Sequence, residues 1–194
     1  MSLSHQQIMR NRTDFLDILS NTVPLLSQRV HKFLDKSDFF YAPASTRYHE
    51  AYEGGLTEHS LKVYEQLLML NHHKLLGFSD ESIAKVALFH DLCKANFYRK
   101  TYKNKKLEDG RWIRTETYEV KEDFPAGHGE KSVALFLVHG GDLTEEEMLA
   151  IRWHMGGFDS STRDYAGNQS LNRAMSMSKL VVGLQIADAM AVWL

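Results

Sequence analysis

Six titratable residues stand where their chemistry could be used: on the apolar face of a predicted helix, at a glycine-flanked helix start, or directly beside such a residue. They are His59, His90, Asp91, His128, His154 and Asp188. Taken alone, a histidine on an apolar face is more often a hydrogen-bonded core residue than a ligand. Imidazole nitrogens and carboxylate oxygens are, however, the ligands that borderline and hard divalent metals prefer. Bundles build metal sites from such side chains on several helices that face one core, so the set predicts a metal site.

Asp188 makes the strongest demand on its surroundings. It lies in the largely apolar stretch 180–192 and shares a helix face with Val181 and Leu184. A carboxylate buried alone is costly, so Asp188 needs a hydrogen-bonded partner, a cation or a raised pKa.

A second group of side chains could bind a substrate. Lys94 lies one helical turn after His90 and Asp91, so its ammonium could reach the metal site and bind a phosphate oxygen. Aromatic and basic residues then alternate along the chain: Tyr98, Arg99, Lys100, Tyr102, Lys103, Lys105 and Lys106. Such a surface can stack bases and attract phosphates. Lysines that protect an edge hairpin from aggregation would give the same composition, so both interpretations stay open.

The segments that carry these residues are predicted to be mainly helical. Apolar periodicity and capping signals predict helices from a cap at Thr13, after Pro24, over about 57–70, from an N-cap at Ser79, after Gly129, from a Thr144–Glu147 capping box, and from about Leu171 to the C-terminus. Residues 97–120 are instead rich in β-prone side chains around Asp109-Gly110, which is a strong hairpin signal. The predicted fold is an all-α bundle with a small β-hairpin inserted at about residues 97–120.

Composition narrows the possibilities further. The 194 residues suffice for one core, and three prolines without a Ser/Gly-rich linker favour a single domain over 1–194. A net charge of −2 gives no chain-wide basic field for nucleic acid. The lone Cys93 excludes an intramolecular disulfide and suits a cytoplasmic location. No apolar run is long enough for a bilayer and no signal-peptide pattern is present, so no membrane association is expected. The remaining histidines are expected at the surface: His5, His31, His49, His72, His73 and His139.

The order of the six residues resembles a family signature. His59, then His90-Asp91, then Asp188 is similar to the H…HD…D pattern of the HD superfamily. Segment 54–61 (GGLTEHSL) resembles the family's first-histidine segment, and segment 88–94 (LFHDLCK) resembles its HDxxK helix. His128 and His154 match the two extra histidines of the binuclear subgroup. The resemblance covers about residues 50–190.

This resemblance implies an HD-domain helical bundle with N-terminal helices in residues 1–50 and a metal-binding core in residues 51–194. His59, His90, Asp91 and Asp188 would bind a first metal, and Asp91 would bridge to a second metal on His128 and His154. Asp91, Lys94, His128 and His154 would take part in catalysis. The composition of the hairpin, independently of the resemblance, makes Tyr98, Arg99 and Tyr102 candidates for substrate binding together with Lys94. The cofactors would be one or two divalent ions among Mn, Mg, Fe, Co, Ni and Zn.

The implied activity is metal-dependent hydrolysis of a phosphomonoester or phosphodiester by metal-activated water. The expected partner is a small-molecule phosphoester, with a nucleotide favoured over a nucleic acid. Two alternatives remain open. The same ligand set suits iron, and some HD-fold proteins that resemble this chain are di-iron oxygenases. The other alternative is a non-catalytic sensor that binds a nucleotide. The GGLxxH and HDxxK contexts are also similar to HD domains of bacterial 3′→5′ exoribonucleases, whose activity is not transferred to this chain.

Overall fold

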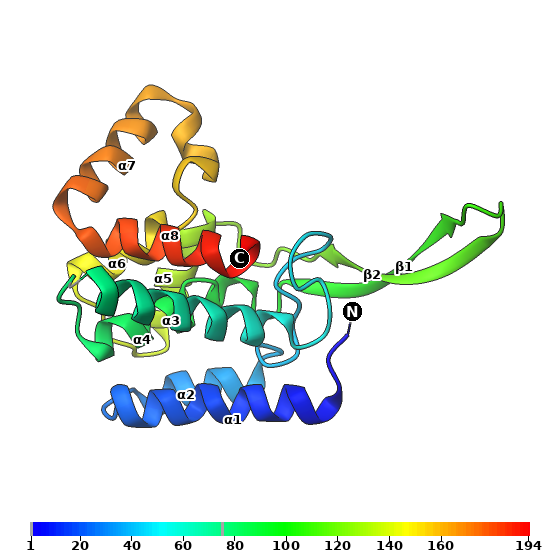
Figure 1. Cartoon of the computed structure of the whole chain (residues 1–194), viewed down its shortest axis with the longest axis horizontal. Helices are drawn as coiled ribbons and strands as arrows, with labels where there is room; N and C mark the ends of the chain where they lie inside the picture. The colour runs from blue at the N-terminus through cyan, green and yellow to red at the C-terminus, as the bar shows by residue number, and fades with distance from the viewer. Residues whose placement is uncertain (1, 75) are drawn as a thin grey trace.

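Helices dominate the structure, a computed structural model that describes residues 2–74 and 76–194 (Figure 1). The α-helices found in that range are α1 (His5–Thr22), α2 (Gln28–Lys36), α3 (Gly55–Lys74), α4 (Asp80–Phe89), α5 (His128–Val138), α6 (Glu145–Trp153), α7 (Tyr165–Met177) and α8 (Lys179–Trp193). Short 3-10 turns are η1 (Leu92–Lys94), η2 (Gly156–Phe158) and η3 (Ser160–Arg163). One antiparallel hairpin joins β1 (Tyr98–Lys106) to β2 (Trp112–Val120). The predicted all-α bundle with an inserted hairpin is confirmed.

The helices pack in a layered arrangement around one buried core. Helix α3 lies along both α4 and α8, and α6 contacts α5 and α8 (Figure 1). The pair α1 and α2 covers the other side of α3 and α4, while α7 stands out from the body beside α8. Aromatic rings link the layers: Phe15 of α1 meets Phe89 of α4 edge-on at 5.8 Å between ring centroids, and Phe89 meets Phe136 of α5 at 4.7 Å. The N-terminal helices therefore share their apolar core with the elements that carry the histidines.

Local capping explains where α4 and α6 begin. The Ser79 hydroxyl accepts a hydrogen bond of 3.1 Å from the backbone N–H of Ser82. In α6 the capping box is complete, because the Glu147 N–H donates to the Thr144 hydroxyl and the Glu147 carboxylate accepts from the Thr144 N–H. Both predicted starts are confirmed. Each of these helices then ends at a C-cap histidine, His90 after α4 and His154 after α6.

The predicted starts of the first two helices are wrong. Helix α1 begins at His5 behind a capping box on Ser4, and Thr13 lies inside the helix with its hydroxyl bonded to the Met9 carbonyl at 3.1 Å. Helix α2 begins at Gln28, capped by Ser27, not at Pro24. The start of α1 was not recognised because most of the residues before Phe15 are polar. Apolar periodicity indicates a helix only where one face of it is buried.

The predicted C-terminal helix is two helices. Apolar periodicity runs through residues 171–192, but the chain is interrupted at Ser178 and α7 and α8 meet at a bend of 106°. The Ser178 hydroxyl caps α8 by accepting from the Leu180 N–H, and it donates to the Glu146 carboxylate of α6 at 2.7 Å. Among the residues described, no helix is by itself long and apolar enough to span a bilayer; only the bent pair α7–α8, taken together, meets those criteria.

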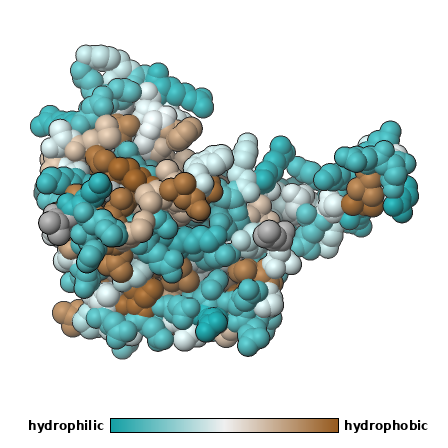
Figure 2. Space-filling model, viewed as in Figure 1, coloured by the Kyte–Doolittle hydropathy of each residue, from teal (hydrophilic) through white to brown (hydrophobic). Residues whose placement is uncertain are grey.

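The hairpin projects from the helical body, as Figure 1 shows. Its turn contains Gly110 at a positive φ of 85°, a conformation that favours glycine, which confirms the prediction from Asp109-Gly110. Its surface is mostly hydrophilic, with a small hydrophobic spot near the tip (Figure 2). Trp112 and Ile113 are exposed large hydrophobic residues of this element.

Candidate metal centre

The first group of candidate ligands lies where α3, α4 and α8 pack together. His59 comes from the first turns of α3, His90 from the end of α4, and Asp188 from α8. The His59 Nε2 atom is 3.1 Å from Asp188 Oδ1 and 3.3 Å from His90 Nε2. Both histidines are almost fully buried. These three residues could hold a metal ion, because their ligand atoms converge on one point.

Two glycines allow the close approaches that this arrangement requires. A Cβ on Gly55 would lie 2.1 Å from the Glu50 carbonyl oxygen, so only glycine lets the preceding loop fold tightly against the start of α3. A Cβ on Gly129 would lie 2.2 Å from the Arg152 carbonyl oxygen of α6. Gly129 therefore lets α5 approach the backbone of α6, and the rings of His128 and His154 come within 5.2 Å of each other, measured between centroids.

Backbone carbonyls set the tautomers of His90 and His154. His90 Nδ1 lies 2.8 Å from the Ala87 carbonyl oxygen, and His154 Nδ1 lies 2.7 Å from that of Ile151. A carbonyl oxygen can only accept, so each Nδ1 carries a hydrogen and each Nε2 keeps a lone pair for a cation. The buried His154 Nε2 has no hydrogen-bond partner among the residues the structure describes. An unsatisfied buried nitrogen of this kind fits a metal ligand.

Asp91 joins the two groups of histidines. Its Oδ2 lies 3.4 Å from His90 Nε2 and 3.8 Å from His59 Nε2. Its Oδ1 lies 2.7 Å from His128 Nε2 and 3.6 Å from His154 Nε2. One buried carboxylate thus presents a different oxygen to each group.

Lys94 and Cys93 complete the surroundings of Asp91. The Lys94 ammonium is buried and lies 2.6 Å from Asp91 Oδ2. The Cys93 sulfur lies 3.3 Å from His128 Nδ1, and Asp91, Cys93 and His128 form a further group whose ligand atoms could hold a metal. Cys93 was not among the site residues predicted from the sequence. Its position between Asp91 and Lys94 in the HDxxK segment was the available signal.

The electrostatics of the cluster favour ionised carboxylates. Burial alone would raise the pKa of Asp91, but Lys94 and His90 outweigh burial and hold that pKa well below its usual range. Burial likewise opposes the charge of Asp188, and the hydrogen bond with His59 lowers its pKa. Burial lowers the pKa of both His59 and His154, which favours neutral imidazoles there. Against the effect of burial, Asp91 raises the pKa of His90, and Cys93 and Asp91 raise that of His128, so a cation that binds at these two rings would displace their protons.

All six residues selected from the sequence lie together in this cluster, from His59 to Asp188. The hairpin residues are placed differently. Burial raises the pKa of Tyr98 to about 12, and the charges of Lys94 and Asp91 act on its hydroxyl. Arg99 pairs with Glu119 across the hairpin, and Tyr102 lies under the Arg114 guanidinium at 4.2 Å from its ring centroid. Arg99 and Tyr102 are therefore engaged with partners within the hairpin itself.

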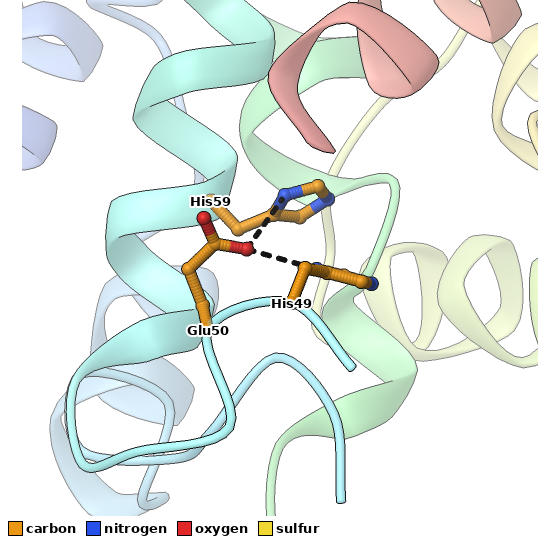
Figure 3. A group of neighbouring side chains, drawn as sticks. All are labelled: His49, Glu50 and His59. Atoms are coloured by element: carbon orange, nitrogen blue, oxygen red, sulfur yellow. Dashed lines mark hydrogen bonds and ion pairs between the residues drawn. The ribbon is translucent and has the colours of Figure 1, made fainter. Parts of the chain in front are cut away.

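His49 and Glu50 are further site residues that were not predicted from the sequence. Figure 3 shows the rings of His49 and His59 both facing the Glu50 carboxylate, with dashed lines from one carboxylate oxygen to both rings. His49 Nδ1 lies 2.9 Å from Glu50 Oε2, and the rings of His49 and His59 are 4.8 Å apart between centroids. These three residues form another group that could hold a metal ion. His49 and Glu50 lie in a loop that has no helical or strand periodicity, so the sequence did not indicate where their side chains point.

The expected surface positions of the other histidines are only half correct. His5, His72 and His73 are exposed, as predicted, but His31, His49 and His139 are half-buried. His49 packs beside His59, and His139 stacks on Phe33 at 4.2 Å between ring centroids. Tertiary packing of a loop and a helix end buries these rings.

Comparison with known proteins gives one match. A family model described as HD domain matches residues 56–193, which is more than half of the chain and includes all six selected residues. No curated protein and no solved structure matched the sequence.

Proposed function

Because this chain belongs to the HD domain family, we propose that it is a metal-dependent phosphohydrolase acting on a nucleotide or another nucleic-acid-derived phosphoester. The observation that supports this most is the placement of Asp91. Its Oδ2 faces His59 and His90, while its Oδ1 faces His128 and His154. A carboxylate shared in this way is the arrangement that two neighbouring cations need.

In this proposal the cluster holds one or two divalent ions. His59, His90, Asp91 and Asp188 would hold the first, and Asp91, His128 and His154 the second. The Nε2 atoms of His90 and His154, which both point into the cluster, and the ionised carboxylates support the assignment. Bound divalent ions would supply charge neutralisation at a phosphate and would lower the pKa of a water to about 7.

The side chains around Asp91 would orient and neutralise the phosphate. Lys94 already lies at the cluster, and its charge would stabilise negative charge that develops on a phosphate oxygen. His128 is the better candidate to donate a proton to the leaving oxygen when it is not a ligand, because 31% of its side chain is exposed against 1% for His154. His128 would therefore lie on the substrate side of the cluster, with His154 behind it.

The hairpin supports a nucleotide as the substrate. Tyr98 lies at the base of the hairpin, where burial and the charge of Lys94 affect the pKa of its hydroxyl. Tyr102 is exposed further along the same strand. Residues two apart share a face of a strand, and 98, 100 and 102 therefore point to one side. An aromatic face that begins beside the cluster suits a base. Lys100 on this face pairs with Glu53 and Glu116, so the phosphate would meet Lys94 instead.

The test is a metal analysis followed by an activity panel. Protein purified without chelator should contain divalent metal, and it should hydrolyse members of a phosphoester and nucleotide panel supplied with Mn, Mg, Fe, Co or Ni. Asp91→Ala should lose metal and turnover together. Metal-loaded protein that hydrolyses nothing on the panel but binds nucleotides would contradict catalysis, and turnover that requires O₂ would identify an oxygenase instead.

A further inference from the structure

Glu50 is a buried carboxylate just outside the cluster of six. Its side chain is only 8% exposed, and its two oxygens contact different residues. Oε1 accepts a hydrogen bond of 2.7 Å from the Lys62 ammonium. Oε2 lies 2.9 Å from His49 Nδ1 and 3.9 Å from His59 Nδ1, as Figure 3 shows. The carboxylate is therefore oriented by Lys62 on one side and directed at two imidazoles on the other.

The backbone conformation of Glu50 is also fixed by its surroundings. Its φ is 42°, a left-handed conformation that non-glycine residues seldom adopt. Its carbonyl oxygen accepts from the N–H groups of Ala44 and Tyr52 at 3.0 and 2.9 Å. Such a conformation persists only where the surroundings determine it, and it is common at functional sites.

His59 needs a partner of this kind. Its Nε2 faces Asp188 and His90, but its buried Nδ1 has no hydrogen-bond partner within the described residues. His90 and His154 meet the same need with backbone carbonyls one helical turn earlier. The Nδ1 of His59 points instead out of α3 towards the loop, where Glu50 Oε2 lies 3.9 Å away.

We propose that Glu50 is a positioning residue for His59: when a cation in the cluster takes the Nε2 lone pair, the ring proton moves to Nδ1, and the Glu50 carboxylate accepts a hydrogen bond from it. This rests on the metal site of the proposed function but not on the reaction catalysed there. His49 shares the oxygen and packs against the His59 ring, which restricts rotation of that ring. A carboxylate behind a metal-ligating histidine fixes its orientation and increases its basicity.

The charge state of Glu50 supports this role. Burial would raise its pKa, but hydrogen bonds from His49 and Lys62 outweigh burial and lower the pKa to about 2. Glu50 is therefore a full carboxylate at neutral pH, which is a stronger acceptor for an imidazole N–H than a backbone carbonyl. His59 would be the histidine in the cluster whose affinity for a cation depends on a side-chain charge outside the ligand set.

Glu50→Gln tests the proposal, with Glu58→Gln as the matched control. Glu58 also contacts Lys62, at 3.5 Å, and accepts from the Tyr52 hydroxyl, but in the part of the chain described no hydrogen bond or ion pair joins its side chain to that of His59. Calorimetric titration with Mn²⁺ should give a Kd that is about 10–100-fold weaker for Glu50→Gln. The Kd of Glu58→Gln should stay close to that of the unaltered protein.

A second measurement separates positioning from loss of fold. In ¹⁵N NMR of the metal-free protein, His59 should be the Nε2–H tautomer, because Nε2 lies 3.1 Å from Asp188 Oδ1. With diamagnetic Zn²⁺ bound it should be the Nδ1–H tautomer, and Glu50→Gln should reach this state only at higher Zn²⁺ concentrations. Glu50→Asp keeps the charge and should restore part of the Mn²⁺ affinity. An unchanged Kd in Glu50→Gln, an Nε2–H tautomer in the Zn²⁺-bound unaltered protein, or equal losses in Glu50→Asp and Glu50→Gln would overturn the proposal. None of these readouts requires phosphoester hydrolysis, so failure of the proposed function would be seen separately.

Discussion

The Lys94 ammonium lies 2.6 Å from Asp91 Oδ2, on the side of the carboxylate that faces His59 and His90. Both residues are buried, and they lie three positions apart across η1. In the metal-free protein Lys94 therefore neutralises the central carboxylate from within the chain. A cation that binds Asp91 through Oδ2 must compete with this ammonium, which would then be available to a phosphate.

Replacing Lys94 should separate metal binding from substrate binding. Lys94→Met removes the competitor for Asp91, so Mn²⁺ affinity should stay the same or increase, whereas kcat/KM for the phosphoester should fall by about tenfold or more. The metal-free protein should lose about 3 kcal/mol of unfolding free energy, because a buried charge loses its partner. Titration calorimetry, steady-state kinetics and denaturant unfolding measure the three effects.

Lys131→Met is the control for this experiment. Lys131 is also a buried lysine, but it pairs with Glu122 and lies over the Phe97 ring. It should cost stability without a specific loss of kcat/KM. A Lys94→Met protein with weaker metal binding and normal turnover would contradict the assigned role.

Neutralising Asp91 should affect both groups of histidines at once. Asp91→Asn keeps the size of the side chain but removes the charge that faces His90 on one side and His128 on the other. Metal content measured by mass spectrometry should fall to well below one ion per chain. Asp188→Asn should be milder, because the Asp188 carboxylate is hydrogen-bonded to His59 of the first group, whereas Asp91 pairs with histidines of both groups. Equal metal retention in the two variants would argue against a shared carboxylate.

His128 should give the metal-free protein a pH-dependent stability. Burial opposes its charge, but the Cys93 sulfur and the Asp91 carboxylate outweigh burial and raise its pKa from 6.5 to about 10. Because the pKa is higher in the folded state, this stabilisation is complete below the unfolded-state value and is lost as the pH rises towards 10. Thermal unfolding with chelator should therefore show falling stability across that window. His128→Asn should flatten the decline, and parallel curves would refute the ion pair.

Tyr102 offers a test of nucleotide recognition by the hairpin. Its ring is 53% exposed and lies against Arg114, so Tyr102→Ala should remove a stacking surface worth about 1–3 kcal/mol. The KM for a nucleotide should rise, while the KM for a small aryl phosphate should not change. Thr101→Ala is the control, since neighbouring residues of a strand point to opposite faces. Equal KM changes for both substrates would show that Tyr102 does not contact the base of the nucleotide.

Ser178 should decide the packing of the last two helices. Its hydroxyl caps α8 and bonds Glu146 of α6, so Ser178→Ala should lower the unfolding free energy by about 1–2 kcal/mol. Denaturant unfolding of the metal-free protein measures the loss. Ser176→Ala is a suitable control, because its hydroxyl bonds only the Arg173 carbonyl within α7. A loss of the same size in both variants would contradict the specific role of Ser178.

The sequence by itself determined the features that depend on neighbouring residues. Ser79 and the Thr144–Glu147 capping box predicted the starts of α4 and α6, and Asp109-Gly110 predicted the hairpin turn. These signals are readable because a cap or a turn is completed within a few residues. The six candidate ligands were also identified from residue type, helical position and order along the chain.

Only the tertiary structure decided how those residues meet. The division of the two Asp91 oxygens between two groups of histidines follows from the packing of α3, α5 and α6 around η1. At the break between α7 and α8, Ser178 bonds Glu146, a residue 32 positions earlier, and apolar periodicity cannot detect such a contact. Glu50 meets His59 because a tight loop folds back against glycine-flanked α3. Contacts between residues distant in sequence follow from the shape of the whole core, whereas periodicity and capping report only on the local chain.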